Sequence, residues 1–184
     1  MNIFVLHRDP TKAARMHCDK HVPKMVVEAA QMMASALRRH GATDEQMPLT
    51  KAGTPYKGGY AHHPCTVWAG DRPQNFRWLY RYAITLCQEY TQRFGKVHAC
   101  SAPINSMWRL VNIIPAGRRT GFALAMPDEY RPDSDDLYGD ETVYHAGHKE
   151  AVKAYRRYYH SKQFAKWEKG TPAPNWWRGV EVTA

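Results

Sequence analysis

A polar stripe in the N-terminal third of the chain carries residue types that perform acid–base and nucleophilic chemistry. Positions 17, 21, 24, 28, 31 and 35 are separated by three or four residues, the spacing of one helical face, and read His, His, Lys, Glu, Gln and Ser. Their neighbours are mostly Met, Val and Ala. Two interpretations stay open: the solvent-facing side of an amphipathic helix with a Lys24–Glu28 ion pair, or the polar wall of a cleft.

Excision of a base from a nucleic acid fits these residues. Cleavage of an N-glycosidic bond needs a carboxylate that stabilises a cationic sugar or activates a nucleophile, and a basic, aromatic pocket for the extrahelical nucleotide. Asp19 and Glu28 supply carboxylates, and Lys20 is able to contact phosphate or to attack the sugar as an amine. Together with the titratable side chain of His21, they form the candidate catalytic set.

A metal site is the alternative chemistry for the same segment. His17 and His21 are four residues apart, so one metal ion could bind both, with Glu28 or Glu89 completing the site. The lysines at positions 20 and 24 would place positive charge beside that ion. We therefore expect no metal and no cofactor, and keep a metal-dependent enzyme that modifies nucleobases or nucleotides as the second hypothesis.

Aromatic and polar residues farther along the chain are candidates for the pocket that holds the base. Residues 63–68 combine histidine, proline, cysteine and tryptophan, and Asn75 follows near the start of an expected helix. Core packing is the competing interpretation for each aromatic residue. The predicted base pocket consists of His17, Gln31, His63, Trp68 and Asn75.

Basic residues interleaved with aromatic ones predict contact with nucleic acid. Residues 153–162 read Lys-Ala-Tyr-Arg-Arg-Tyr-Tyr-His-Ser-Lys, a pattern that combines neutralisation of phosphates with stacking on bases. The competing interpretations are a solvated helix whose tyrosines pack inward and, for the bases around Gly95, stabilisation of a helix dipole. The predicted DNA-binding residues are Lys24, Arg93, Lys96, His98, Arg118, Arg119, Tyr155, Arg156, Arg157, Tyr159 and Lys162.

The composition agrees with a polyanionic partner. The 184 residues carry a net charge of +9, with 26 Lys and Arg against 17 Asp and Glu. Seven of these acids fall in residues 128–141 beside one arginine, so the rest of the chain has a net charge of +15. No apolar run is long enough to span a membrane, no signal peptide is recognisable, and the four cysteines form no CxxC pair, so we expect a cytoplasmic monomer.

Helical spacing dominates the pattern of apolar residues. Helices are expected over residues 10–20, 23–39, 73–94, 103–113 and 142–168, with a short helical turn at 63–68 and a buried extended segment at 2–6. Residues 41–62 and 114–141 are expected to be long loops. We therefore predict an all-α fold, a single domain over residues 1–184 that is built as an irregular helical bundle.

The segments described above resemble the small, mostly phage or bacterial proteins known as pyrimidine-dimer DNA glycosylases, or endonuclease V-like proteins. The resemblance rests on residues 2–6, 17–31, 63–68, 75–79, 89–98, 126–130 and 155–159, and so covers most of the chain. It implies a compact all-α protein that kinks double-stranded DNA, with an N-terminal α-amine as imine-forming nucleophile and a glutamate as the key acid. In this sequence Glu28 would be that glutamate, and residues 155–159 would contact DNA.

Position 2 departs from that pattern, because an α-amine there requires removal of Met1, and Asn2 is a poor substrate for this processing. We therefore expect attack by water, assisted by Asp19 or Glu28, or by a lysine. The leading hypothesis is a glycosylase that flips a damaged or modified pyrimidine out of the duplex and leaves an abasic site, with a lyase step left open. Its substrate would be a photodimer, as in DNA repair, or a hypermodified pyrimidine of phage DNA, as in antiviral defence. A non-catalytic DNA-binding module is the third hypothesis.

Overall fold

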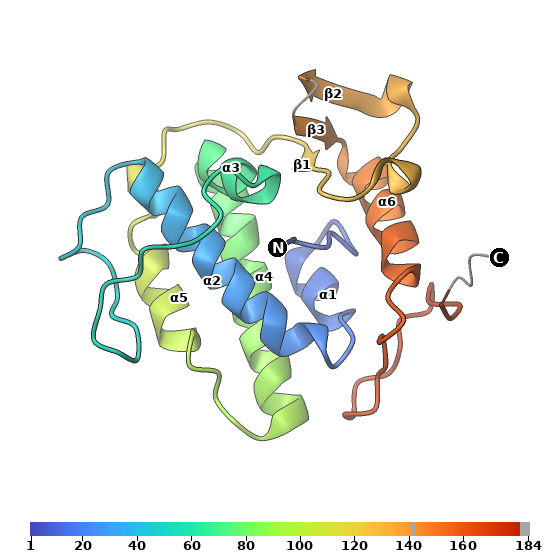
Figure 1. Ribbon diagram of the computed structural model, residues 1–184, viewed down its shortest axis with the longest axis horizontal. Helices are drawn as coiled ribbons and strands as arrows, with labels where there is room; N and C mark the ends of the chain where they lie inside the picture. Colours follow the sequence, from blue (N-terminus) through green and yellow to red (C-terminus); the bar gives the residue numbers. More distant parts are fainter. Residues whose placement is uncertain (141–142, 181–184) are drawn as a thin grey trace.

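A computed structural model describes residues 1–140 and 143–180 of the chain. Within these residues the fold is mostly helical and includes a three-stranded sheet (Figure 1). The helices are α1 (Pro10–Arg15), α2 (His21–Arg39), α3 (Pro64–Asp71), α4 (Pro73–Phe94), α5 (Ser101–Trp108) and α6 (His148–His160). The strands are β1 (Phe122–Ala123), β2 (Leu137–Asp140) and β3 (Val143–Ala146), and single 3₁₀ turns occupy Val111–Ile113, Asp128–Tyr130 and Ser134–Asp136.

Local sequence signals account for the ends of several helices. The Asp9 carboxylate accepts a hydrogen bond from the backbone N–H of Lys12 (3.0 Å), and Pro10 occupies the first position of α1. Helix α4 ends at Gly95, whose φ of 68° is left-handed. Helix α2 begins two residues before Pro23 rather than at it, because N–H groups of the first turn have no partner within the helix, so proline removes nothing there.

The sequence pattern does not predict the sheet, and the all-α prediction is wrong in this respect. A helix is expected over residues 142–168, whereas residues 143–146 form β3, and α6 begins only at His148 and ends at His160. Strand β3 pairs antiparallel with both β1 and β2, so that Ala146 lies opposite Phe122 and Leu137. Strands of two to four residues are too short for their two-residue period to be distinguished from a loop.

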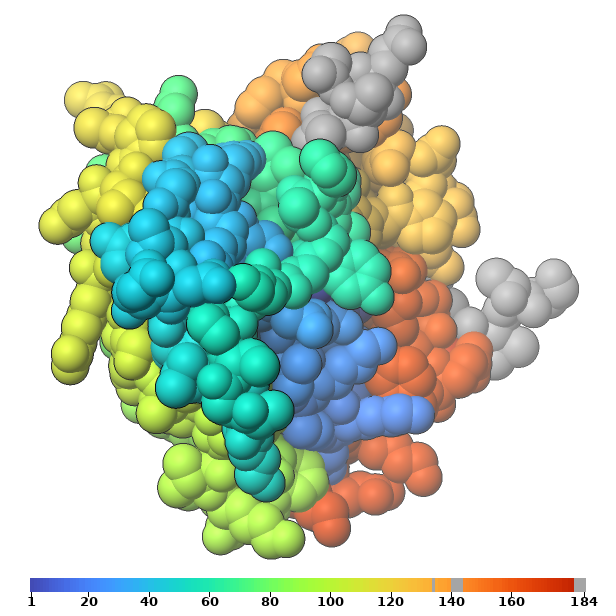
Figure 2. Space-filling model, turned by 60° about the vertical axis from the view of Figure 1, so that its left-hand side comes forward, coloured from blue at the N-terminus to red at the C-terminus, as the bar shows by residue number. Residues whose placement is uncertain are grey.

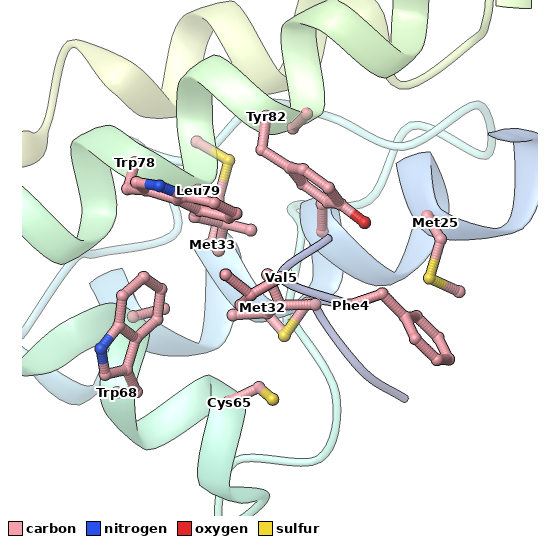
Figure 3. Close-up of a cluster of buried hydrophobic side chains, with 14 of the residues drawn as sticks. Phe4, Val5, Met25, Met32, Met33, Cys65, Trp68, Trp78, Leu79 and Tyr82 are labelled. Carbon is pink, nitrogen blue, oxygen red and sulfur yellow. The ribbon is translucent and has the colours of Figure 1, made fainter. Parts of the chain in front are cut away.

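The N-terminal segment lies in the middle of the core. The side chains of residues 3–6 are at most 5% exposed and pack among side chains from α2, α3 and α4 (Figure 3). Phe4 adopts a left-handed φ of 45°, a conformation that costs a bulky residue on the order of 1–3 kcal/mol. Burial of four apolar side chains offsets that cost, and the segment holds residues 1 and 2 in a fixed position.

The C-terminal residues 161–180 form an irregular segment that packs against the N-terminal third of the chain. The backbone N–H of Asp19 donates to the carbonyl of Lys166 (2.9 Å), and the Asp19 carboxylate accepts from the N–H of Glu168 (2.6 Å). Figure 2 shows this orange-red segment beside the blue N-terminal part of the chain. Aromatic contacts of Tyr159 with Trp167, Trp176 and Trp177 fix it to α6.

Candidate active site

Glu28 on α2 faces three nitrogen groups. Its Oε2 accepts a hydrogen bond from the backbone N–H of Asn2 at 2.9 Å and lies 3.9 Å from the α-amine of Met1. Its Oε1 lies 3.8 Å from Nζ of Lys24, one helical turn earlier. The carboxylate is 12% exposed, so solvent screens these interactions only in part. A carboxylate and a primary amine are thus adjacent in the middle of the polar stripe.

Asn2 fixes the chain end at this position. Its side-chain amide donates to the carbonyl of Ala125, and its Oδ1 accepts from the N–H of Ile3 at 2.8 Å. The Oδ1 atom also accepts from the thiol of Cys65 on α3, at 3.7 Å. The N-terminus is therefore tied to α2, α3 and the segment that follows β1, which explains its place between α3 and α6 in Figure 1.

A cavity of about 160 Å³ opens next to Glu28. Two lysines, Lys24 and Lys162, line it, and Nζ of Lys162 lies 3.4 Å from the centroid of the Tyr158 ring. The cavity therefore combines a carboxylate, an α-amine and two ammonium groups with aromatic walls. The complete set of lining residues is Met1, Asn2, Phe4, His21, Lys24, Met25, Glu28, Tyr158, Lys162 and Phe164.

The two histidines of the stripe are neutral hydrogen-bonding groups. His17 is fully buried: its Nδ1 pairs with the carbonyl of Ala13 (2.9 Å), and its Nε2 pairs with the hydroxyl of Tyr82 (2.8 Å). His21 lines the cavity, and its Nδ1 pairs with the hydroxyl of Tyr159 (2.8 Å). Burial lowers the pKa of His17 to about 3 and the pKa of His21 to about 2. His17 thus belongs to the core rather than to a base pocket.

Asp19 lies in an ionic network separate from Glu28. Its Oδ1 accepts from Nη1 of Arg93 at 3.1 Å, and Arg93 also pairs with Glu89, 2.8 Å away. The side chain of Arg93 is 0% exposed and has its donors occupied, so the expectation that it contacts DNA has to be corrected. The network joins α1, the connection between α1 and α2, α4 and the C-terminal segment, which gives Asp19 a structural role. Lys20 is exposed, with Nζ 4.8 Å from the ring centroid of Phe164 at the cavity wall.

The tyrosines expected to stack on DNA are buried. Tyr155 is 0% exposed and donates to the carbonyl of Ala123 (2.7 Å). Tyr159 is also 0% exposed, and its hydroxyl accepts from the backbone N–H of Cys18 (2.9 Å). The interpretation of inward-packing tyrosines is therefore the correct one for these two positions, because both lie on the core face of α6.

The other residues expected to bind DNA are distributed over several surfaces. Lys24 and Lys162 lie at the cavity, whereas Lys96 and Arg118 are exposed in loops after α4 and α5. Half-buried His98 accepts from the N–H of Cys100. The exposed Arg119 lies over the ring of Phe122, Arg156 donates to the carbonyl of Leu6, and the exposed Arg157 donates to the carbonyl of Arg131.

The residues expected to form a base pocket do not converge. Trp68 and Asn75 are 0% exposed, and the Asn75 amide bonds the Trp68 carbonyl and Thr120 within the core. Gln31 is half-buried on α2 beside Gly59. His63 lines a cavity that is different from that of Glu28 but shares Tyr158 with it.

The sequence favours water or a lysine over the N-terminal α-amine that the resemblance implies, and it does not single out the Asn2 anchor or the aromatic walls Tyr158 and Phe164. Burial of residues 2–6 is the signal that points to the α-amine and to Asn2, because a buried segment so close to the chain end places that end against the core.

The described residues contain no group of three or more His, Cys, Asp and Glu placed to hold a metal ion. The rings of His17 and His21 lie 6.0 Å apart, centroid to centroid, and are bonded to different tyrosines. Both histidines expected as metal ligands are thus hydrogen-bonded to other side chains. None of the described helices is both long and apolar enough to cross a membrane.

Comparison with known proteins agrees with the resemblance seen in the sequence. No curated protein and no solved structure matches the chain. Among protein families, residues 1–101 match pyrimidine dimer DNA glycosylase, which covers α1 to α4, Glu28 and the anchored N-terminus. The family implies a glycosylase that acts on DNA. The chain belongs to the pyrimidine dimer DNA glycosylase family.

Proposed function

We propose that this protein excises an altered pyrimidine from double-stranded DNA, with Glu28 as the acid–base group and an amine at the N-terminus as the nucleophile. One observation carries the proposal: Glu28 Oε2 is 3.9 Å from the Met1 α-amine and 2.9 Å from the nitrogen of Asn2, beside a cavity. If Met1 is removed in the cell, the nitrogen of Asn2 becomes the free amine at the shorter distance. Either form places an amine next to the carboxylate.

The chemistry follows from this pair. The lone pair of the deprotonated amine attacks C1′ of the deoxyribose, and the bond between C1′ and the base breaks, with its electrons going to the base. Glu28, in its acid form, gives a proton to the leaving base and, as carboxylate, accepts one from the new C–N centre. Glu28 returns that proton to O4′ as the C1′–O4′ bond breaks and the sugar ring opens to an imine; removal of a proton from C2′ of the imine then permits elimination of the 3′ phosphate and hence a lyase step.

Water is the competing nucleophile. In that case the Glu28 carboxylate takes a proton from water, hydroxide adds to C1′, and the base leaves with the bonding electrons and is then protonated. No imine forms, and the product is an abasic site with the strand intact. Covalent trapping separates the two routes.

Positive charge around the cavity supports a DNA substrate. Lys24 and Lys162 line the cavity, and Lys20 lies at the ring of Phe164 on its wall. These lysines neutralise phosphates of the strand that carries the target nucleotide. Because the amine and Glu28 lie inside a recess, the sugar reaches them only if the nucleotide leaves the base stack.

The test is borohydride trapping on duplexes that contain a cyclobutane dimer, followed by peptide mapping of the adduct. We expect a covalent complex at the peptide that contains residue 1 or 2, and we expect Glu28→Gln to bind the duplex but to release no base. Release of the base without a covalent adduct would show that water, and not the amine, is the nucleophile. Failure to release any base from ultraviolet-irradiated, hydroxymethylated or glucosylated DNA would overturn the proposal and leave a DNA-binding module.

A further inference from the structure

A cavity lined by arginines lies on the exposed face of α4. Its volume is about 380 Å³, and its lining residues are Pro10, Gln74, Arg77, Trp78, Arg81 and Arg119. Three of these residues are arginines and none is acidic, so this arginine cavity is positively charged. It shares no lining residue with the cavity of Glu28 (the active-site cavity), and the two are therefore separate.

Arg119 is held at this cavity by a buried asparagine. The N–H of Thr120, the next residue, donates to Oδ1 of Asn75 at 3.1 Å, and Nδ2 of Asn75 donates to Oγ1 of Thr120 at 2.9 Å. Asn75 is 0% exposed on α4, so it fixes the loop against the helix that carries the other two arginines. The Arg119 guanidinium lies over the ring of Phe122 on β1, with Cζ 5.3 Å from the centroid, which restricts its side chain as well.

The arginines of this cavity have no ion-pair partner among the described residues, whose arginine–carboxylate pairs involve other side chains. Arg77 and Arg81 are one turn apart on α4, a spacing at which like charges destabilise a helix. The guanidinium of Arg77 lies over the ring of Trp108, with Cζ 5.7 Å from the centroid. The pKa of Asp9 is lowered mainly by the hydrogen bond from the N–H of Lys12 and in smaller part by the charge of Arg81. An external anion would therefore relieve the repulsion between the arginines.

The arginine cavity and the active-site cavity lie on different sides of the hydrophobic core. Trp78 lines the first, whereas Phe4 and Met25 line the second. Figure 3 shows these side chains at two ends of the buried cluster, with Val5 and Leu79 between them. A ligand bound at one cavity therefore leaves the other accessible.

Phosphate is the anion that suits guanidinium groups best. A planar guanidinium donates to two oxygens of a phosphate at once, and three such groups around one opening fit the phosphates of a strand. Gln74 and the three arginines are exposed, so the cavity is open enough for a polymer. DNA is the phosphate polymer on which this family acts.

We propose that the arginine cavity binds the phosphate backbone of a second DNA segment while a first segment occupies the active-site cavity, so that one protein molecule holds two segments. Arg77, Arg81 and Arg119 make the phosphate contacts, which do not depend on the base sequence. The protein is thereby able to pass directly from one segment to another during its search for altered bases. The inference goes beyond the proposed function, because it requires DNA as the partner but no chemistry at Glu28.

The test counts the duplexes bound per protein molecule by sedimentation velocity, with an excess of undamaged duplexes of about 12 base pairs, little more than one helical turn. A straight duplex of this length cannot reach both cavities. We expect two duplexes per wild-type molecule and one per molecule of Arg77→Gln/Arg81→Gln. Glutamine is a good helix former and both positions are exposed, so α4 stays folded. The affinity of this variant for a duplex that contains a dimer should stay within about twofold of the wild type.

Two further variants complete the test. Lys51→Gln/Lys149→Gln removes the same charge from exposed positions outside both cavities and should still bind two duplexes. Arg119→Gln, in the loop rather than in α4, should weaken binding of the second duplex alone. It should also reduce the slope of log affinity against log salt for that step by about 1.

One duplex per wild-type molecule, or two duplexes bound unchanged by the arginine variants, would overturn the inference. Equal weakening of both duplexes in Arg77→Gln/Arg81→Gln would also overturn it, because the arginines would then belong to the active-site interface. Displacement of one duplex alone by thymidine monophosphate would assign the cavity to a free nucleotide instead. Protein dimers that form without DNA and are lost in the same variant would assign it to a second copy of this chain. Two duplexes bound by a protein that excises no base would reject the proposed function alone, whereas excision by a protein that binds one duplex would reject the second site alone.

Discussion

Substitution of Arg93 distinguishes clearly between a structural role and a DNA-binding role for this side chain. The sequence pattern predicts a phosphate contact, whereas the side chain is 0% exposed. Its five N–H bonds match five acceptor contacts: two to Glu89, and one each to Asp19 and the carbonyls of His17 and Arg15. Replacement by methionine keeps much of the volume and removes every one of these contacts.

The expected loss of stability in Arg93→Met depends on the two carboxylates that remain after the guanidinium is removed. Glu89 is 6% exposed and Asp19 is 14% exposed, so both carboxylates would remain in a weakly solvated place without their cation. Removal of one member of a buried ion pair costs about 3–5 kcal/mol. For a chain of this length that corresponds to a decrease in Tm of roughly 6–20 °C. Thr171 still donates to Glu89 at 3.1 Å, which limits the loss.

The assay is urea unfolding of Arg93→Met and of the double variant Arg93→Met/Glu89→Leu, followed by duplex binding below the unfolding transition. We expect the double variant to recover part of the lost stability, because it no longer buries the Glu89 carboxylate. Duplex affinity of the folded single variant should remain within about twofold of the wild type. A loss of stability below about 1 kcal/mol, combined with a large loss of affinity and a smaller salt dependence, would refute the structural role and restore the phosphate contact.

Three further predictions concern residues in α2 and α6 or next to their ends. Tyr159→Phe leaves the N–H of Cys18 and the ring of His21 without their hydrogen-bond partner. Urea unfolding should therefore show a loss of about 1–3 kcal/mol in the free energy of unfolding, while the affinity for duplex DNA stays unchanged. Weaker DNA binding without a loss of stability would contradict the burial of Tyr159. The folded-state pKa values of His17 (about 3) and His21 (about 2) lie below the unfolded value of 6.5, so the unfolded chain binds more protons at acidic pH. The free energy of unfolding should therefore be at its full value above pH 6.5 and should decrease by about 2 kcal/mol per histidine on acidification to about pH 5. Urea unfolding of the wild type and of His21→Phe at several pH values measures this. A wild-type free energy that does not change with pH, or a pH dependence in His21→Phe equal to that of the wild type, would show that these rings are not held neutral by burial. Lys162→Ala should weaken binding of all duplex sequences alike and reduce the slope of log affinity against log salt by about 1, as measured by anisotropy at several salt concentrations; an unchanged slope would remove Lys162 from the DNA contact.

Helix positions were largely predictable because their signals are local. The Asp9 cap, the prolines at the starts of α1, α3 and α4, and the left-handed Gly95 each act within one turn of the chain. The apolar spacing of α2 and α4 also defined which face is buried. The sheet escaped prediction because its longest strands have four residues and because one of its two pairings, β1 with β3, joins residues more than twenty positions apart.

The sequence by itself determined a basic, mostly helical protein of this family and predicted Glu28 as its key carboxylate, since family motifs and helical periods are properties of short segments. Only the tertiary structure decided what lies beside Glu28. Asp19 and Glu28 are nine positions apart, yet the first pairs with Arg93 and the second faces the N-terminus. Arg93 and Lys162 are both basic, yet one is buried and the other lines the cavity. The physical reason is that burial and pairing depend on contacts between distant segments, and no local pattern specifies which charges those contacts enclose.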